Sequence, residues 1–239
     1  MTTYAEPIDG EGYAILAGSP FDELRATGET IDAQAATLLP PVTPGKVFGI
    51  GVNFPGEEPP GRSFPSAFLM PPSAIVASGV DVVLPPLFGS IVAEGELAVV
   101  IGRRARRLSV AEAESVILGY TIANDLSGRD PKFEHLPPAV KKGCDGFLPL
   151  GPCLLLEPAP RHFPIVTRIN GEEKQRGNTR DMLFSIAECI HHITRAITLE
   201  PGDVISLGTP PPKPTVIPGD TMSVAIEGIG CLENRVIAR

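Results

Sequence analysis

Three acidic side chains stand in apolar stretches where an isolated charge is costly. In the segment AEGELAVVIG, Glu94 and Glu96 lie two residues apart, and on a β-strand this spacing directs both carboxylates to the same face. Neighbouring carboxylates raise each other's pKa, so the pair needs a cation or a shared proton. Asp125 ends a second apolar run, GYTIAND, where a strand would pass into a loop. Three carboxylates without a cysteine predict a hard ion, Mg²⁺ or Mn²⁺, with positions open to water or substrate oxygens.

The same residues have a simpler interpretation. Glu94 and Glu96 would line a solvent face and Asp125 would only begin a turn, which is the commoner outcome for a Glu-x-Glu pair considered alone. The spacing does not choose between the two interpretations, so the choice depends on the wider sequence.

The elements that must position these residues are predicted to be mostly strands. Among the 239 residues, 27 prolines and 25 glycines are spread between short apolar runs, a pattern typical of strands separated by turns. Residues 1–43 are predicted to be a small N-terminal appendage and residues 44–239 one catalytic domain. The strand candidates of the second part are KVFGIGVNF, SAFLM, AIVAS, VDVVLP, GELAVVIG, GYTIAND, CLLLEP, PIVTRING, DVISLGTP and TMSVAIEGIG.

Two helices are predicted among these strands. In SVAEAESVILGY, Ser109 and Glu112 match a capping box, and apolar residues recur at helical spacing as far as Ile117. A second helix is predicted to follow an N-cap at Asn178 or Thr179. Its apolar stripe, which indicates a core-facing helix rather than a cofactor site, consists of Leu183, Ile186, Ile190, Ile193 and Ile197.

Composition excludes several classes of protein. A net charge of -8 and a pI near 5.1 disfavour a nucleic-acid partner. No window approaches the roughly 20 apolar residues that span a bilayer, and the N-terminus lacks a signal-peptide pattern, so we expect a cytoplasmic protein without a membrane partner. The four cysteines are widely spaced, which fits reduced thiols rather than disulfides or a zinc site.

From Lys46 to near Arg239 the chain resembles the fumarylacetoacetate hydrolase superfamily. The blocks that carry the resemblance, in the family's order, are GVNF, EGELAVVIG, GYTIANDLSGRD, KGCDGFLPLGP, INGEEKQ, LEPGDVISLGTP and PGDTMSVAIEGIGCLEN. Within the superfamily, the segments GTPPPKPTVIPGD and KKGCDGFLPLG look most like the decarboxylase/isomerase enzymes of homoprotocatechuate (4-hydroxyphenylacetate) breakdown.

The resemblance implies an α+β, mainly β fold with a rolled mixed β-sheet core and a few helices, usually as a homodimer. It implies a Mg²⁺ or Mn²⁺ site at the three carboxylates identified above. It also implies roles for four further residues of this sequence. Lys142 is expected near the metal, and the substrate contacts are expected from Asn53, Arg129 and Thr209. As single residues, each could equally be a solvated charge or part of an ordinary turn.

The chain departs from the family pattern at three places. Family hydrolases carry a His and a Glu shortly after the GVNF-type block to activate water, whereas PGEEPPG follows here, leaving Glu57 and Glu58 as replacement bases. His135 is the one histidine within reach of the site by sequence, and it is not assigned a role. Lys132 stands where the family often has Gln, and we expect it to bind a distal carboxylate. Met70 replaces a family Lys.

These features predict a divalent-metal-dependent decarboxylase and/or isomerase of an unsaturated 2-oxo dicarboxylic acid in aromatic catabolism, acting through a metal-stabilised enolate. One alternative is an acylpyruvate- or fumarylpyruvate-type C–C hydrolase or an oxaloacetate decarboxylase. Another, of a different class, is a catalytically silent protein that binds a metal and an oxo acid.

Overall fold

The computed structural model of the chain describes residues 3–8, 12–56, 61–133, 135–156 and 162–239. The chain divides into two compact units, Met1–Leu38 and Leu39–Arg239. Within the described ranges, no helix is long and apolar enough to cross a membrane.

The first unit is a three-stranded antiparallel sheet in the order β1-β2-β3. Its strands are β1 (Tyr4–Ile8), β2 (Gly12–Gly18) and β3 (Leu24–Asp32), and the 3-10 helix η1 (Ala33–Ala35) follows. The Asp32 carboxylate accepts from the Gln34 amide and begins that helix. Most of β3 is exposed and polar, so its sequence contains no apolar run that would indicate a strand.

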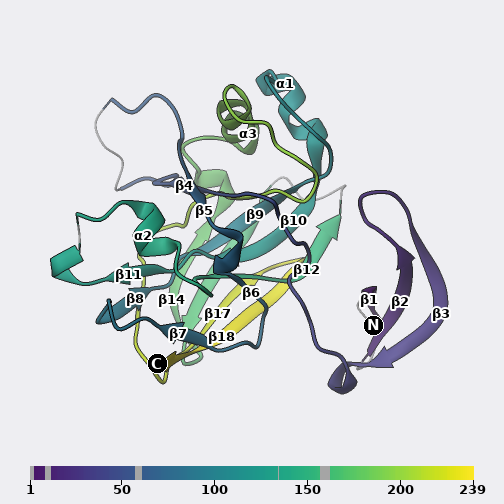
Figure 1. Cartoon of the computed structure of the whole chain (residues 1–239), viewed down its shortest axis with the longest axis horizontal. Helices are drawn as coiled ribbons and strands as arrows, with labels where there is room; N and C mark the ends of the chain where they lie inside the picture. Colours follow the sequence, from purple (N-terminus) through teal and green to yellow (C-terminus); the bar gives the residue numbers. More distant parts are fainter. Residues whose placement is uncertain (1–2, 9–11, 57–60, 134, 157–161) are drawn as a thin grey trace. The chain divides into compact units, whose positions relative to one another are not determined.

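The second unit is built from three sheets, visible as the stacked arrows of Figure 1. The seven-stranded sheet has the order β5-β4-β15-β9-β10-β12-β6 and consists of β4 (Val47–Gly51), β5 (Ser66–Met70), β6 (Ile75–Val76), β9 (Gly95–Ile101), β10 (Ile117–Asn124), β12 (Leu148–Leu156) and β15 (Val204–Ser206). The five-stranded sheet has the order β14-β13-β17-β18-β7 and consists of β7 (Val82–Leu84), β13 (Pro164–Ile169), β14 (Glu172–Asn178), β17 (Thr221–Ile226) and β18 (Gly230–Ala238). The three-stranded sheet has the order β11-β8-β16 and consists of β8 (Ser90–Val92), β11 (Ser127–Arg129) and β16 (Thr215–Val216).

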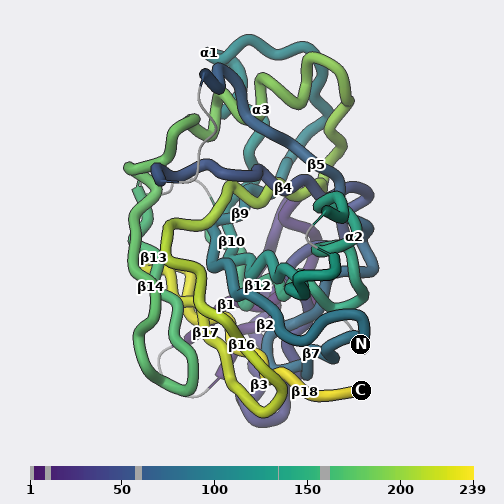
Figure 2. Tube along the Cα trace, turned by 90° about the vertical axis from the view of Figure 1, so that its left-hand side faces the viewer, coloured from purple at the N-terminus to yellow at the C-terminus, as the bar shows by residue number. Residues whose placement is uncertain are grey.

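Parallel and antiparallel pairs both occur in these sheets. β4 pairs parallel with β15, whereas β9 pairs antiparallel with β10. The helices are few: α1 (Val110–Ala113), α2 (Pro138–Lys142), α3 (Ile186–Thr194) and the 3-10 helices η2 (Pro72–Ala74), η3 (Glu114–Val116), η4 (Pro131–Phe133) and η5 (Thr179–Asp181). In both views α1 and α3 lie side by side, at the top of the second unit (Figures 1 and 2). The predicted fold class, mainly β with a mixed curled sheet and few helices, is confirmed.

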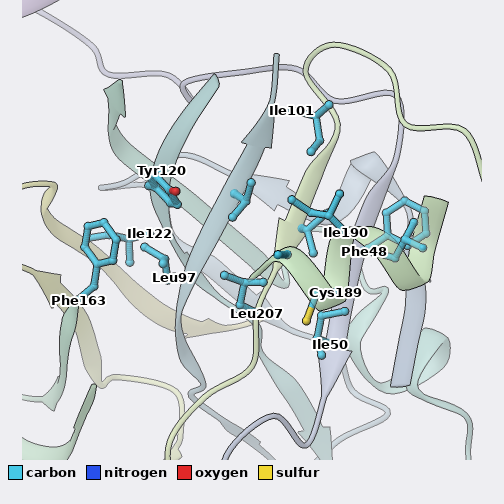
Figure 3. Close-up of a cluster of buried hydrophobic side chains, with 14 of the residues drawn as sticks. Phe48, Ile50, Leu97, Ile101, Tyr120, Ile122, Phe163, Cys189, Ile190 and Leu207 are labelled. Carbon is cyan, nitrogen blue, oxygen red and sulfur yellow. The ribbon is translucent and has the colours of Figure 1, made fainter. Parts of the chain in front are cut away.

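Strand β9 is buried on both faces, which explains its continuous apolar run from Leu97 to Ile101. On one face, Leu97 packs in a cluster with Ile122 and Phe163, shown in Figure 3. On the other face, Ala98 and Val100 belong to a second cluster. Because residues alternate along a strand, Glu96 lies on the face of Ala98.

The first predicted helix is present, as α1 followed directly by the 3-10 helix η3. The Glu112 carboxylate accepts from the Ser109 amide at 2.9 Å, which is one half of the predicted capping box, and also from the Ser109 hydroxyl at 2.6 Å. The helical spacing predicted as far as Ile117 holds to Val116. Ile117 itself begins β10, because it pairs with Ile101 of β9.

The predicted start of the second helix was also wrong. Asn178 accepts from the Arg180 amide at 3.0 Å, but it caps only the 3-10 helix η5. The α-helix begins after Ser185, whose hydroxyl accepts from the Glu188 amide, while the Glu188 carboxylate accepts from the Ser185 amide. Leu183 therefore lies ahead of the helix. Ile190 and Ile193 are buried in the main core cluster, as the apolar stripe predicted.

Candidate metal centre and substrate pocket

Glu94 and Glu96 flank the first residue of β9. Gly95 between them faces the five-stranded sheet, where an added Cβ would lie 2.4 Å from the Thr167 hydroxyl oxygen. No other residue fits there without displacing buried neighbours. The alternation of the strand then sends the side chains on either side of Gly95 to the opposite face, which is the same-face arrangement predicted from the spacing.

Asp125 reaches the same place from the end of β10. In the antiparallel register Asn124 lies opposite Gly95, and the Asn124 side-chain oxygen accepts from the Glu94 amide at 2.9 Å. The Asp125 amide donates to the Glu94 carbonyl oxygen, also at 2.9 Å. One ligand atom from each of Glu94, Glu96 and Asp125 can be chosen so that all lie within 4.8 Å of one another. The three side chains are buried, with 6%, 1% and 2% exposure.

Neighbouring donors hold two of the carboxylates. The Ser127 hydroxyl donates to Glu94 at 2.9 Å. Glu96 accepts at one oxygen from the Ser206 hydroxyl at 2.6 Å and from the Gly208 amide at 2.7 Å. Gly208 has φ of +93°, and an added Cβ would lie 2.8 Å from the Asn53 Cβ, so the turn that aims this amide at Glu96 requires glycine.

Lys142 supplies a positive charge to the cluster. From the end of α2, its ammonium donates to Glu94 at 2.9 Å, to the Asp125 carboxylate at 2.8 Å and to the Asp125 carbonyl at 3.1 Å. The side chain is 13% exposed, so this ion pairing is nearly dry. Burial lowers the pKa of Lys142, but the surrounding carboxylates outweigh it and raise that pKa, so the lysine is charged.

The three carboxylates differ in their electrostatics. Burial would raise the pKa of Glu94, but Lys142 and Lys213 outweigh it and hold that pKa below its usual value. Burial, together with the charge of Asp125, raises the pKa of Glu96 well above its usual range. Burial raises the pKa of Asp125 to about 6. The cluster therefore carries more buried negative charge than the nearby lysines compensate.

These residues fit a hard divalent cation. The Asp125 Oδ1 atom is buried and has no hydrogen-bond partner among the described residues, which is costly unless another group occupies the site. The neighbouring oxygens of Glu94 and Glu96 complete an all-oxygen donor set, the kind that Mg²⁺ and Mn²⁺ prefer. A cation would also remove the repulsion that raises the pKa of Glu96 and Asp125.

A small pocket of about 30 Å³ opens over the carboxylates. Its polar walls are the triad, Lys142, Thr209 and Lys213, and its apolar walls come from residues 50–52, Phe54, Pro55 and Phe68. Thr209 is 7% exposed, and its hydroxyl oxygen accepts from the Gln175 side chain at 3.0 Å. Lys142, predicted to lie near the metal ligands, and Thr209 thus both line the pocket over the triad, and the substrate contact of Thr209 stays a prediction.

The other residues with predicted roles lie further away. Asn53 is fully buried and does not line the pocket; its amide nitrogen donates to the Leu207 carbonyl and its oxygen accepts from the Phe184 amide. Its polar atoms are thus paired with backbone groups of two other segments, and the substrate contact predicted for Asn53 stays a prediction. Arg129 is exposed and lines a neighbouring hollow.

Lys132 and His135 are exposed and line neither the pocket nor that hollow. Lys132 belongs to η4, where its amide donates to the Asp130 carboxylate. Glu57 and Glu58, the predicted replacement bases, lie outside the described residues.

Sequence reasoning missed two residues of the site. Lys213 lines the pocket and acts electrostatically on the triad, yet nothing in its local sequence marked it except its place in the GTPPPKPTV segment. Gln175 is buried and holds the Thr209 loop from β14; the INGEEKQ block contains it, but a polar strand gives no sign of which side chain faces inward.

Comparison with known proteins adds independent findings. The family model described as fumarylacetoacetate (FAA) hydrolase C-terminal matches residues 46–237. A 4-hydroxyphenylacetate degradation bifunctional isomerase/decarboxylase of Salmonella dublin is 34% identical, over 95% of this chain and 56% of its own length. A mitochondrial oxaloacetate tautomerase of Homo sapiens is 36% identical, over 90% of this chain and 74% of its own. The crystal structure of a 5-carboxymethyl-2-hydroxymuconate delta-isomerase from Mycobacterium smegmatis has a TM-score of 0.91 and 35% identity, covering 99% of this chain and 94% of that one.

Proposed function

This chain belongs to the fumarylacetoacetate hydrolase family, and from that premise we propose that it is a divalent-metal-dependent isomerase and/or decarboxylase of an unsaturated 2-oxo dicarboxylic acid in aromatic catabolism. The observation that carries the proposal is the buried triad of Glu94, Glu96 and Asp125, in which the Asp125 Oδ1 atom has no hydrogen-bond partner among the described residues. The similarity to the isomerase/decarboxylase of Salmonella dublin and to the mycobacterial isomerase supports the reaction class.

The triad would hold the ion, Mg²⁺ or Mn²⁺, through its carboxylate oxygens. When bound, such a cation supplies Lewis acidity toward the oxo and carboxylate oxygens of a 2-oxo acid. Lys142 keeps Glu94 and Asp125 ionised and oriented, because its ammonium is hydrogen bonded to both. Its charge beside the pocket also favours negative charge developing on the substrate.

Thr209 is suited to orient the substrate. Its oxygen already accepts from Gln175, so its hydroxyl hydrogen is the group it can offer to a carboxylate oxygen of the substrate. Phe54 and Phe68 line the pocket next to these polar groups and restrict water around the reacting carbons.

Isomerisation and decarboxylation need no water-activating base, whereas C–C hydrolysis does. Among the described residues that line the pocket there is no histidine, which favours the first two reactions. The hydrolase alternative depends on Glu57 or Glu58, which lie outside the described residues. We also propose that the chain acts as a cytoplasmic homodimer whose only other partner is the oxo acid; its four thiols, all unpaired, suit a reducing compartment.

The test is turnover by purified protein stripped with EDTA and then given Mn²⁺ or Mg²⁺. The substrates are 5-carboxymethyl-2-oxo-hex-3-ene-1,6-dioate, oxaloacetate and an acylpyruvate, and the reactions are followed by carbon dioxide release and enol absorbance. We expect metal-dependent double-bond shift or carbon dioxide release with the first substrate. Metal-dependent cleavage of the acylpyruvate alone would support the hydrolase instead, and tight metal binding without turnover would support a silent binding protein.

A further inference from the structure

Two hollows meet at Lys213. The pocket over the triad measures about 30 Å³, which is space for about one or two water-sized groups. Beside it lies an open hollow of about 560 Å³. Pro211 and Lys213 line both of them. A substrate whose oxo-acid end enters the pocket must therefore extend its remaining atoms elsewhere, and the adjoining hollow has the room.

The chemistry of the larger hollow favours an anion. Its described lining contains two cationic side chains, Arg129 and Lys213, and no acidic one. Val92, Pro211 and Pro212 provide apolar surface along the same wall. A hollow with cationic and apolar walls suits a short hydrocarbon chain that ends in a carboxylate.

Lys213 also acts on the first pocket. Its positive charge is among the effects that hold the pKa of Glu94 down and oppose the rise of the pKa of Asp125. Its ammonium therefore lies within electrostatic reach of the triad while the residue borders the larger hollow. The side chain is half-buried, where a charge is screened less than on an open surface.

The backbone on both sides of Lys213 is fixed. Gln175 donates to the Pro212 carbonyl at 2.8 Å, and the Ala93 amide donates to the Pro214 carbonyl at 2.9 Å. Proline on each side of the lysine restricts the backbone further. The loop is therefore already ordered in the folded protein, so a ligand that binds there loses little conformational entropy of the chain.

We propose that Lys213 binds the second carboxylate of a linear 2-oxo dicarboxylate whose oxo-acid end occupies the pocket over the triad, with the carbon chain running past Pro211. The inference rests on the proposed function and deepens it, because it names the residue that selects a dicarboxylate over a monocarboxylate. It gives Lys213 the role that the sequence suggested for Lys132, which lines neither hollow.

A matched pair of ligands isolates this contact. 2-Oxoadipate and 2-oxohexanoate have the same chain length and the same chelating end, and differ only in the distal carboxylate. Their affinities for Mn²⁺-saturated protein are measured by calorimetry, after the affinity of each variant for Mn²⁺ has been determined. We expect the unsubstituted protein to prefer 2-oxoadipate, and Lys213→Ala to weaken that ligand about tenfold while leaving 2-oxohexanoate unchanged.

Two variants serve as controls. Lys213→Arg keeps the charge and should retain most of the preference for 2-oxoadipate. Lys174→Ala removes an exposed lysine whose partner is Glu172, at 2.7 Å, and should change neither affinity, which controls for the loss of one positive charge.

Several outcomes overturn the inference. Equal weakening of both ligands by Lys213→Ala would mean that the lysine acts only through the triad. No change for either ligand would mean that it contacts none, and selective weakening by Lys132→Ala alone would move the subsite there. Metal-dependent binding of neither acid by the unsubstituted protein would count against the proposed function as well, whereas a wrong subsite leaves metal-dependent binding intact.

Discussion

The Asp125 amide donates to the Glu94 carbonyl oxygen at 2.9 Å, so the backbones that carry two of the candidate metal ligands are hydrogen bonded to each other. The bond follows the last residue pair of β9 and β10, Gly95 opposite Asn124. Two carboxylates that repel each other are thereby held by backbone pairing. Because this hydrogen bond joins backbone atoms, it brings the two side chains together without using a carboxylate oxygen that a cation would need.

Metal removal should destabilise the protein more as the pH rises. In the metal-free protein the pKa of Asp125 is about 6, and that of Glu96 is also raised. The folded state therefore favours the protonated carboxyls, and their contribution to the free energy of unfolding is complete below about pH 4. It is lost as the pH rises through 6. A cation binds the ionised forms and reverses this trend. The gap between the melting temperatures with Mg²⁺ and with EDTA should widen from about pH 5 to about pH 7.5. A constant gap would contradict the prediction.

Lys142→Met should cost the metal-free protein about 3–5 kcal/mol of unfolding free energy, because it leaves Glu94 and Asp125 buried without their cationic partner. Urea denaturation with and without Mn²⁺ measures it, and part of the loss should return with the metal. The exposed ion pair of Lys174 with Glu172 gives the control: Lys174→Met should lower the free energy of unfolding by less than about 1 kcal/mol. Similar costs for both variants would show that the Lys142 ion pairs contribute nothing special.

Ser206→Ala should weaken metal binding about tenfold, because the Ser206 hydroxyl orients the Glu96 carboxylate at 2.6 Å. Calorimetry with Mn²⁺ measures this effect. Ser115→Ala is the matched control, since the Ser115 hydroxyl donates only to the nearby Glu112 carbonyl on the exposed side of η3. An unchanged affinity in Ser206→Ala would mean that the Gly208 amide suffices to hold Glu96.

Gly95→Ala should unfold the protein or destabilise it by more than about 3 kcal/mol, because the new methyl group would overlap Thr167 and Val224 between the two main sheets. Gly171→Ala tests a different cost, since that glycine has open space but φ of +80°. It should lose about 1 kcal/mol through backbone strain alone. A larger loss of stability for Gly171→Ala than for Gly95→Ala would contradict the tight packing of Gly95 against Thr167 and Val224.

Ser185→Ala should cost about 1 kcal/mol, because Ser185 is the N-cap of α3. Thermal or urea denaturation measures the loss. Leu183→Ala should cost comparatively little, since Leu183 is 37% exposed and lies ahead of the helix. A large loss for Leu183 with none for Ser185 would instead match the earlier helix start predicted from the sequence.

The strands that the sequence revealed were those with continuous apolar runs. β9 and β10 were found because both of their faces are buried. β14 and β18 were not found. β14 reads EEKQRGN, and Gln175 is its only fully buried side chain. In β18, Asn234 is buried on the same face as Leu232 and Val236. The Asn234 side chain donates to the carbonyls of Ala77 and Val80, partners that no local pattern could indicate.

Some residues of the candidate site could likewise be identified from the sequence, and others could not. Strand alternation related Glu94 to Glu96, the end of a second apolar run indicated Asp125, and the family resemblance added Lys142 and Thr209. The resemblance also assigned Asn53 to the substrate, whereas its side chain is hydrogen bonded to backbone groups of two other segments. Lys213 depends on how a Pro-rich loop is tied to β14 and β8, which only tertiary structure reveals.

The carboxylates and the Pro-rich loop are built on different parts of the fold. The positions of the carboxylates depend on the register of β9 with β10. Residues 209–214 are instead held by hydrogen bonds from the Gln175 side chain and the Ala93 amide. Natural variation can therefore rewrite the loop without disturbing the ion-holding strands. A substitution in this six-residue stretch can therefore reshape one wall of the pocket while the register that brings the carboxylates together stays as it is.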